Sequence, residues 1–525
     1  MIEPNRHEQT YDSSTLSFPK FGAGECGKRL TSFGNGVLGG GLIARASPSA
    51  AKKSMGRASG RRRDQAADRL DCSNKKCSAS TMPTPPAQPS RRDVLAGFGG
   101  LAGALAAGPS SSRADAGATA ALGLRLAAAE ATLRGALPAS PVWDFIGGPW
   151  PLLRQDDSLD LTLTNDLPVP VLLDWRSCDG TPAVEPLLVQ RPLQPGQTST
   201  LRLALTQAGT VLCDARLLGD GLARPLPATG LAVLERHPPT VDADRLVTIT
   251  DWRVRPDGSV VAPGVALGDA TTVFTANGVT ALDLVTRAHS RLRLRFINAC
   301  HRSPIALKID DHDLRVVAID GLPASPFSAR DGQLVLAPGT RLDAFVDATG
   351  RPGTTSAIWL HDRVSVRRLG QLVYEGTEPL RPAPLGPSDA LTASALPERL
   401  ALSSARRVEL AVDGRAEGAT ATWSSPSAFT TATPPLFQVK RGATVVLALL
   451  NRGAAPVTFH LHGHRVRWLD RLDDGWKPFW LDTLLVPGNQ TVRVAFLAEH
   501  VGPWMIEMMG TDWTAPRLVH WYAVS

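Results

Sequence analysis

Three histidines at alternate positions are the residues of this sequence best placed to do chemistry. His460, His462 and His464 lie in a run of Val, Thr, Phe and Leu that is typical of a β-strand. Alternate side chains of a strand point to the same side, so His460 and His462 could bind one metal ion. Structural zinc needs four protein ligands and catalytic zinc usually has three. Glu507 could be a third ligand, but we expect it to hydrogen-bond one imidazole, and we expect His464 to be structural.

Thiolate chemistry is missing from the part of the chain that contains these histidines. The last cysteine is Cys300. A blue-copper site needs one cysteine thiolate and two imidazoles, usually with a weak axial ligand. Met505, Met508 and Met509 are the only methionines after Met82. Thioether clusters can bind Cu(I), but flexible methionines also fill gaps in a core, and we expect that second role here.

The order and spacing of these residues resemble the C-terminal cupredoxin domain of the multicopper oxidases. In that family a His-Pro-x-His-x-His stretch is followed by Gly-x-Trp and then His-Cys-His-x-x-x-His. Here Val457 stands at the first histidine position, and a Gly-Pro-Trp triplet leads into the second stretch. The His, Cys, His and His positions of that stretch are occupied by Glu507, Met508, Met509 and Trp513. The resemblance implies that the mononuclear copper site has lost its principal ligands and that Trp513 plugs its pocket.

Two further motifs of the family are altered near the start of the globular region. Multicopper oxidases carry two His-x-His pairs in their first domain, which complete a three-copper cluster with the last domain. Here the matching stretches read Asp174-Trp-Arg176 and, after Ala-Gly-Thr, Asp214-Ala-Arg216. The resemblance implies that this cluster is lost as well, with only His460 and His462 kept as vestigial ligands.

The two Asp-x-Arg pairs have a structural use of their own. Both members of each pair would point to the same side of their strand. We therefore expect a buried network of charge-assisted hydrogen bonds among Asp174, Arg176, Asp214 and Arg216. The alternative is that these strand ends lie at the surface and are solvated.

Length and charge limit the classes of protein that fit. The chain has 525 residues, enough for about two to four domains. Residues 1–81 hold 14 Lys and Arg against 7 Asp and Glu, which accounts for the whole net charge of +7. Because the remainder is neutral, the basic pI does not indicate a nucleic-acid partner, and we expect none.

The first 116 residues are not expected to belong to the folded domains. Residues 1–81 have no periodic apolar pattern, so we interpret them as a disordered or mis-annotated upstream extension, with Met82 as the start. Residues 82–116 contain Arg91-Arg92 after a serine, a short apolar run and an Ala-x-Ala site. These features predict a twin-arginine signal peptide and a bacterial periplasmic location. The apolar run is too short to span a membrane, and we expect no transmembrane segment.

The rest of the chain has an all-β pattern of short alternating runs separated by Pro, Gly and Asp turns. We divide it into blocks at 122–238, 240–376 and 398–525, with a Pro-rich linker at 377–397. The middle block resembles the second domain of the same family. The resemblance implies three consecutive cupredoxin-like Greek-key β-sandwich domains.

Two cysteines lie beside the Asp-x-Arg pairs. Cys178 follows Arg176 by two residues, and Cys213 precedes Asp214. If these strand ends converge, a Cys178–Cys213 disulfide would suit an oxidising periplasm. Two buried thiols are an equally good reading.

The function that these observations favour is a structural one. Copper-free relatives are known that resemble this chain, including exported proteins that stabilise the bacterial division ring. The resemblance implies an interaction or scaffold role with envelope or division proteins, as a monomer and without a cofactor. One alternative is an oxidase of phenols or metal ions that uses copper. The other is a copper-binding or copper-buffering protein.

Overall fold

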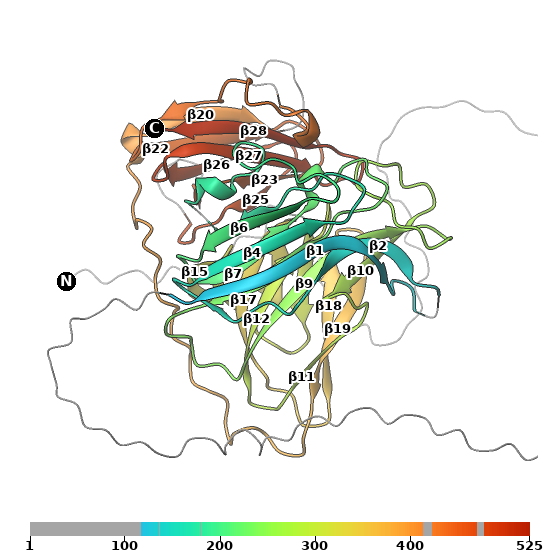
Figure 1. Cartoon of the computed structure of the whole chain (residues 1–525). Helices are drawn as coiled ribbons and strands as arrows, with labels where there is room; N and C mark the ends of the chain where they lie inside the picture. The colour runs from blue at the N-terminus through green and yellow to red at the C-terminus, as the bar shows by residue number, and fades with distance from the viewer. Residues whose placement is uncertain (1–116, 136, 179, 413–422, 470–476) are drawn as a thin grey trace, which may run out of the picture. The chain divides into compact units, whose positions relative to one another are not determined.

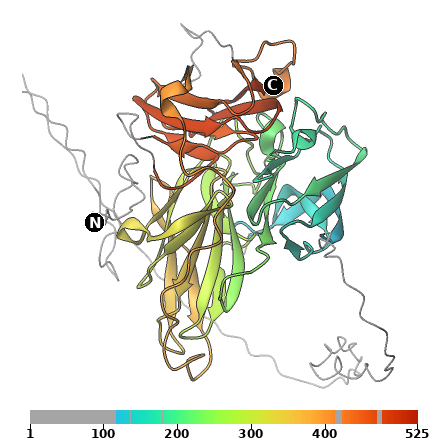
Figure 2. The ribbon, with the colours of Figure 1, turned by 90° about the vertical axis from the view of Figure 1, so that its left-hand side faces the viewer.

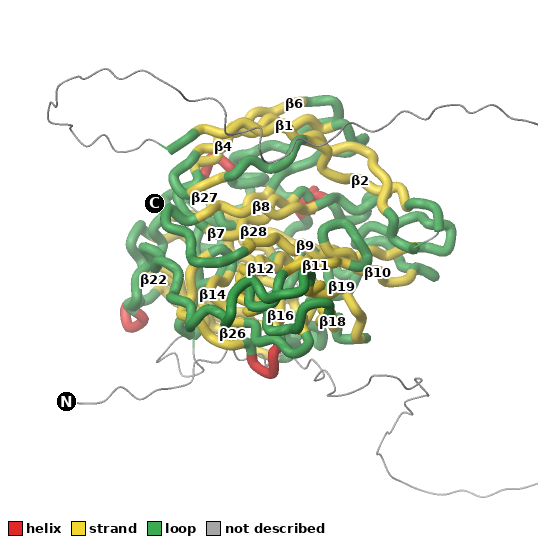
Figure 3. The backbone as a smooth tube through the Cα atoms, turned by 90° about the horizontal axis from the view of Figure 1, so that it is seen from below, coloured by secondary structure: helices red, strands yellow, loops and turns green. Residues whose placement is uncertain are grey.

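The computed structural model describes residues 117–135, 137–178, 180–412, 423–469 and 477–525. The expected extension at 1–81 and the signal peptide at 82–116 lie outside these residues, so both remain predictions. Within the described part of the chain, no helix is long and apolar enough to cross a membrane. Strands account for nearly all the regular structure, and the few helical turns are short 3₁₀ segments (Figure 3). The all-β fold class is confirmed.

The first domain is built from two four-stranded sheets with the orders β2-β1-β4-β6 and β3-β8-β7-β5. Its strands and helical turns are β1 (Thr119–Ala131), β2 (Ser140–Gly147), β3 (Leu153–Arg154), β4 (Ser158–Asn165), β5 (Asp174–Arg176), η2 (Pro182–Val184), β6 (Thr198–Ala204), β7 (Gly209–Asp214), η3 (Arg216–Leu218) and β8 (Ala228–Leu234).

The second domain pairs a six-stranded sheet, β10-β9-β12-β17-β14-β15, with a five-stranded sheet, β11-β19-β18-β13-β16. Its elements are β9 (Ala243–Val254), β10 (Thr271–Ala276), β11 (Leu282–Thr286), β12 (Arg291–Asn298), β13 (Ile305–Ile309), β14 (Arg315–Ile319), β15 (Leu322–Ser328), η4 (Arg330–Gly332), β16 (Leu334–Leu336), β17 (Arg341–Asp347), β18 (Thr355–His361) and β19 (Val366–Tyr374).

The third domain has the sheets β20-β22-β26-β24 and β21-β28-β27-β23-β25, drawn in orange and red in Figure 1. Its elements are η5 (Leu402–Ser404), β20 (Arg406–Ala411), η6 (Pro426–Ala428), β21 (Gln438–Val439), β22 (Thr444–Asn451), β23 (Val457–Leu461), β24 (Arg467–Trp468), β25 (Thr483–Val486), β26 (Gln490–Leu497), β27 (Gly502–Gly510) and β28 (Arg517–Val524). Between β19 and β20 the described chain contains only η5, so the Pro-rich segment forms no strand there.

The same pairings recur in each domain. One sheet of every domain contains a parallel pair near its start, namely β1 with β4, β9 with β12 and β20 with β22. The other sheet contains a second parallel pair, namely β3 with β8, β11 with β19 and β21 with β28. This repetition is what three copies of one architecture produce.

Strand patterns in the sequence explain where the core lies. In β4, Leu159, Leu161 and Leu163 are buried while the residues between them are not. Period-2 alternation of this kind buries one face of a sheet against its partner. The second and third domains share one continuous apolar core cluster, and the first domain has its own. Figure 2 shows the red and orange strands of the third domain beside the green and yellow strands of the second.

Candidate functional site

Two short strands of the first domain bring the Asp-x-Arg pairs together. β5 and β7 are antiparallel, and Asp174 lies directly opposite Asp214 in their register. Both aspartates and both arginines, Arg176 and Arg216, are buried. The expected network is therefore present, and the reading that these strand ends are solvated is wrong.

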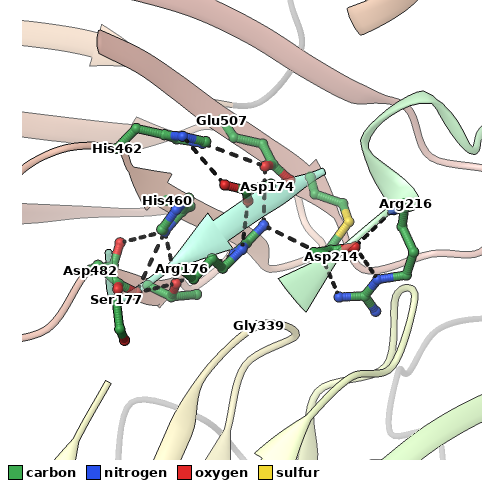
Figure 4. A network of polar contacts seen from close by, with 12 residues as sticks. Asp174, Arg176, Ser177, Asp214, Arg216, Gly339, His460, His462, Asp482 and Glu507 are labelled. Atoms are coloured by element: carbon green, nitrogen blue, oxygen red, sulfur yellow. Dashed lines mark hydrogen bonds and ion pairs between the residues drawn. The ribbon is translucent and has the colours of Figure 1, made fainter. Parts of the chain in front are cut away.

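Arg176 is the centre of this network (Figure 4). Its Nε donates a hydrogen bond to Asp174 Oδ2 at 3.1 Å, and its Nη2 donates to Glu507 Oε2 of the third domain at 3.1 Å. The same Nη2 forms an ion pair with Asp214 Oδ2 at 3.8 Å. Burial opposes the charge of Arg176, but the carboxylates of Glu507, Asp174 and Asp214 hold its pKa above the ordinary value. One guanidinium thus links two domains.

The second domain leaves room for this guanidinium at Gly339. The backbone φ of Gly339 is +92°, and a Cβ built there would lie 2.4 Å from Arg176 Nη1. A side chain at this position would collide with the ion network and would be strained as well. Gly339 and Arg176 are drawn together in Figure 4.

Arg216 holds the other side of the network. It pairs with Asp214 through two hydrogen bonds, of 2.8 Å from Nε to Oδ1 and 2.7 Å from Nη2 to Oδ2. Its Nη1 also donates to the carbonyl oxygens of Ala299 and Cys300 in the second domain, at 2.5 and 2.7 Å. Burial would raise the pKa of Asp214, but Arg216 lowers it below its ordinary range.

His460 is a neutral, hydrogen-bonded core residue. Its Nδ1 lies 2.9 Å from Thr483 Oγ1 and 3.1 Å from the carbonyl oxygen of Asp482. Burial, together with the charges of Arg176 and His462, lowers its pKa to about 3. His464 is likewise structural, since its Nδ1 lies 2.6 Å from the Tyr522 hydroxyl.

His462, in contrast, is positively charged. Its Nδ1 lies 3.3 Å from Glu185 Oε1 and 3.7 Å from Asp174 Oδ1. Burial alone would lower its pKa, but the carboxylates of Glu185 and Asp174 raise it to about 10. His462 is therefore an imidazolium at neutral pH, which has no free lone pair on either nitrogen for a metal ion.

Glu507 does not act as expected. Its Oε2 is 3.9 Å from His462 Nε2, which is an ionic contact and too long for a hydrogen bond. Instead Glu507 binds Arg176 and, at 2.9 Å, Arg517 Nη1. Burial would raise its pKa, but these two arginines hold it well below the usual range. The prediction of a Glu507–imidazole hydrogen bond is wrong because two guanidinium groups compete for the same carboxylate.

A small cavity of about 20 Å³ lies between Asp174, Glu185 and the two histidines. Such a volume holds about one water molecule. Asp174, His460 and His462 each place one possible ligand atom within 4.8 Å of the others. Three oxygen and nitrogen ligands could hold a single ion if His462 lost its proton. A three-copper cluster does not fit this set, because two guanidinium groups stand where imidazoles would be needed.

The positions that the family resemblance assigns to the mononuclear copper ligands hold apolar residues. Val457 and Met508 are buried in the shared core cluster, next to Phe459. Neither offers an imidazole or a thiolate, so these residues do not fit a blue-copper ion. Met509 points elsewhere, with its sulfur 3.0 Å from Nη1 of Arg302 in the second domain.

Trp513 is buried, and its contacts come from the second domain. That it plugs the mononuclear copper pocket remains a prediction. Its indole nitrogen donates to the carbonyl oxygen of Ala262 at 2.9 Å. The guanidinium of Arg253 lies 4.4 Å from its ring centroid, and His301 packs against it edge to face at 5.7 Å. All of these contacts are with the second domain. The tryptophan therefore seals a domain interface.

The disulfide reading of Cys178 and Cys213 is wrong for this structure. Cys213 is a fully buried thiol, and no disulfide joins it to Cys178 within the described residues. Burial raises the pKa of the Cys213 thiol well above its ordinary value, and the negative charges of Asp214 and Asp174 raise it further. A protonated thiol in this position packs as a small apolar group.

Sequence reasoning missed four residues that complete the site. Glu185 accepts a hydrogen bond from the backbone of Met505 at 2.8 Å besides facing His462. Arg517 neutralises Glu507, and Asp482 with Thr483 positions His460. Asp482 and Thr483 follow a Trp-Leu pair in the third-domain motif, which was the available signal. Glu185 and Arg517 lie in no motif that could have indicated them.

Comparison with known proteins agrees with this fold. Sequence profiles of the multicopper oxidase family match residues 244–368 and residues 405–514. Laccase-1 of Cryptococcus neoformans var. grubii is 27% identical over 217 residues, covering 36% of this chain and 34% of that protein. Laccase-6 of Oryza sativa subsp. japonica is 25% identical over 236 residues, covering 40% of this chain and 39% of that protein. The chain thus spans well under half the length of these two relatives.

Solved structures give the same answer for the fold. A multi-copper oxidase from Pseudomonas thermotolerans has a TM-score of 0.66 at 23% identity, covering 78% of this chain and 100% of its own. Lac15 from a marine microbial metagenome has a TM-score of 0.62 at 24% identity, with coverage of 78% and 100%. The sequence matches thus cover the second and third domains, where this chain is similar to multicopper oxidases, and the solved structures share its fold.

Proposed function

We propose that this protein is an exported member of the multicopper oxidase superfamily that has lost its mononuclear and trinuclear copper sites. In this proposal it works without a redox cofactor as an interaction or scaffold protein of the bacterial periplasm. Its partners would be envelope or division proteins, as the resemblance to copper-free exported relatives implies.

One observation carries the proposal. The guanidinium of Arg176 lies among Asp174, Asp214 and Glu507, at the junction where the superfamily binds three copper ions. A cation fixed by three carboxylates in a water-poor site repels metal cations and occupies their space. Breaking such a buried pair is strongly unfavourable, so copper ions would have to displace a structural element.

The apolar filling of the mononuclear position supports the same conclusion. In a multicopper oxidase this site accepts electrons from the reducing substrate. Val457 and Met508 leave no thiolate and no imidazole pair for it. Oxidase chemistry would therefore lack both an entry point for electrons and a place to reduce oxygen.

The test is copper content and visible absorbance of the full chain, expressed with copper supplied during growth. We expect substoichiometric copper, no blue band and no oxidation of phenols. The multi-copper oxidase from Pseudomonas thermotolerans, prepared in parallel, is the positive control. Stoichiometric copper with a blue band would overturn the proposal and restore the oxidase reading.

A second candidate is a metal-binding or copper-buffering protein. The observation that favours it is the trio Asp174, His460 and His462, together with a buried His462 Nε2 that has no hydrogen-bond partner in the described residues. Titration with Cu(II) and Zn(II) tests it. Tight binding that disappears in His460→Ala would support this candidate, and equal weak binding by both proteins would exclude it.

A further inference from the structure

β6 is an unpartnered edge strand of the first domain. It ends the sheet order β2-β1-β4-β6 and pairs only with β4 in the described part of the chain. Figure 3 shows it along the outer margin of this sheet, beyond β4 and β1. Its outer edge is therefore open for hydrogen bonds with a further strand.

The register shows which groups face outward. The backbone N–H of Asn165 donates to the carbonyl of Gln197, and the N–H of Leu205 donates to the carbonyl of Asp157, both at 2.9 Å. In an antiparallel pair the residues that exchange hydrogen bonds alternate with residues that do not. Odd-numbered residues of β6 thus bind β4. Thr198, Thr200 and Arg202 direct their N–H and C=O groups away from it.

This edge lacks the usual protection against strand addition. Natural edges are blunted by proline, lysine or β-bulges. β6 reads Thr-Ser-Thr-Leu-Arg-Leu-Ala, without proline or lysine. Its register with β4 runs from Ser158↔Ala204 to Thr164↔Thr198 without a shift, so no bulge interrupts it. The one charged residue, Arg202, is paired with Asp160 on the outer face at 2.6 and 2.7 Å.

An apolar hollow adjoins the same edge. It has a volume of about 350 Å³ and lies between the inward-facing side of β6 and the layer opposite. Ser199 and Leu201 of β6 line one wall, since they share a face with the buried Leu163 and Leu161 of β4. The apolar residues at 171–173 and Leu193 line the other side. A strand added to β6 would point alternate side chains into this hollow.

The polar and charged groups around the hollow indicate what kind of segment would bind there. Arg191 is the one charged residue in the lining, is exposed at the rim, and forms no ion pair within the described residues. The neighbouring rim groups are the amide of Gln190 and the hydroxyls of Ser199 and Thr200. These groups suit a carboxylate, because a guanidinium can bind both of its oxygens.

We propose that the edge of β6 and the adjoining hollow bind an extended segment of a partner protein. The segment adds to the sheet as a strand, inserts alternate apolar side chains into the hollow and presents a carboxylate to Arg191. Main-chain hydrogen bonds give such a complex its affinity, and the hollow gives its specificity. This inference rests on the interaction role proposed above and supplies its surface.

The test begins with selection of a random display library of peptides on the full-length protein. We expect enriched peptides in which apolar residues alternate with polar ones and one Asp or Glu recurs. The best peptide is then measured by fluorescence anisotropy. Thr200→Pro removes an outward donor without removing a bond to β4, and proline is tolerated at sheet edges. We expect it to weaken binding about tenfold or more.

Matched variants separate this effect from misfolding. Thr200→Val keeps the backbone N–H and loses only the hydroxyl, so it should weaken binding much less than Thr200→Pro does. Arg191→Glu should weaken binding of the acidic peptide and strengthen binding of a peptide in which the acidic residue is replaced by Lys. This pair of measurements tests the inference even if Thr200→Pro fails to fold. Enriched peptides without alternation, or equal binding by Thr200→Pro and the parent, would overturn the inference. Peptide binding does not depend on copper content. Copper retention would therefore contradict the proposed function but would not decide whether the peptide binds.

Discussion

The family resemblance places copper ions at two positions of this chain, and the two are filled by opposite means. Val457 and Met508 stand at one, and the network around Arg176 stands at the other. The first lies within the third domain and is packed with apolar side chains. The second lies where the first and third domains meet and is packed with paired charges. The difference follows from what surrounds each position.

The position of Val457 and Met508 is surrounded by the apolar core cluster that the second and third domains share. Val457 and Met508 lie on the neighbouring strands β23 and β27, and apolar side chains there join an existing core. Burial of apolar surface requires no specific partner. The domain junction is different, because Asp482, Glu185 and backbone carbonyls already line it. Polar groups buried there need partners, and long arginine side chains reach several at once.

The largest effect is expected from Arg176→Ala. It leaves the carboxylates of Asp174, Asp214 and Glu507 buried without their shared cation, which costs about 3–5 kcal/mol of unfolding free energy. The double variant Asp174→Asn with Arg176→Gln should lose less, because it removes both charges. Urea unfolding of the three proteins measures this. Arg202→Ala, at an exposed ion pair that solvent screens, is the control and should change stability far less than Arg176→Ala.

If Arg176→Ala and the double variant unfolded at the same urea concentration, the ion network would not be what stabilises the junction. The contrast between the apolar position and the charged one would then not hold for the charged position.

A smaller effect is expected at the apolar position. Met508→Ala opens a cavity in the shared core and should cost about 2–4 kcal/mol. Met508→Leu nearly conserves volume and should cost less than about 1.5 kcal/mol. Both are measured by the same urea unfolding. A stability unchanged by Met508→Ala would mean that this side chain is loosely packed and that the position is not a filled core.

A third effect is a loss of stability at alkaline pH. The folded-state pKa of His462 is raised from 6.5 to about 10, so the folded state holds a proton that the unfolded state releases. Its contribution to stability is complete below about pH 6.5 and is lost as the pH rises towards 10. Thermal unfolding between these pH values should show a decline that His462→Gln lacks. His464→Gln should keep the decline, since the pKa of His464 is lowered instead.

Much of the fold could be predicted from local patterns. The alternation of Leu159, Leu161 and Leu163 indicates a half-buried strand, because the period of a strand is visible in residues that are close in the sequence. The fold class followed from such patterns and from the family resemblance. The pairing of Asp174 with Asp214 could also be predicted in part, because both Asp-x-Arg motifs lie at the ends of strands that converge.

The candidate site was less accessible because its partners are far apart in the chain. Arg176 and Glu507 are 331 residues apart, and Met505 and Glu185 are 320 apart. Nothing in their local sequences says that they meet. Glu507 was expected beside an imidazole, yet Arg176 and Arg517 both reach it once the domains are packed.

The sequence by itself determined which chemistry this protein can supply. It places no cysteine after Cys300 and puts Asp-x-Arg where the family has His-x-His. Composition of this kind does not depend on folding. Only the tertiary structure decided how the remaining charges are used, which histidine is charged, and that Trp513 packs against the second domain. Those outcomes depend on distances between domains, because electrostatic and packing energies act between atoms that the fold, and not the chain, makes neighbours.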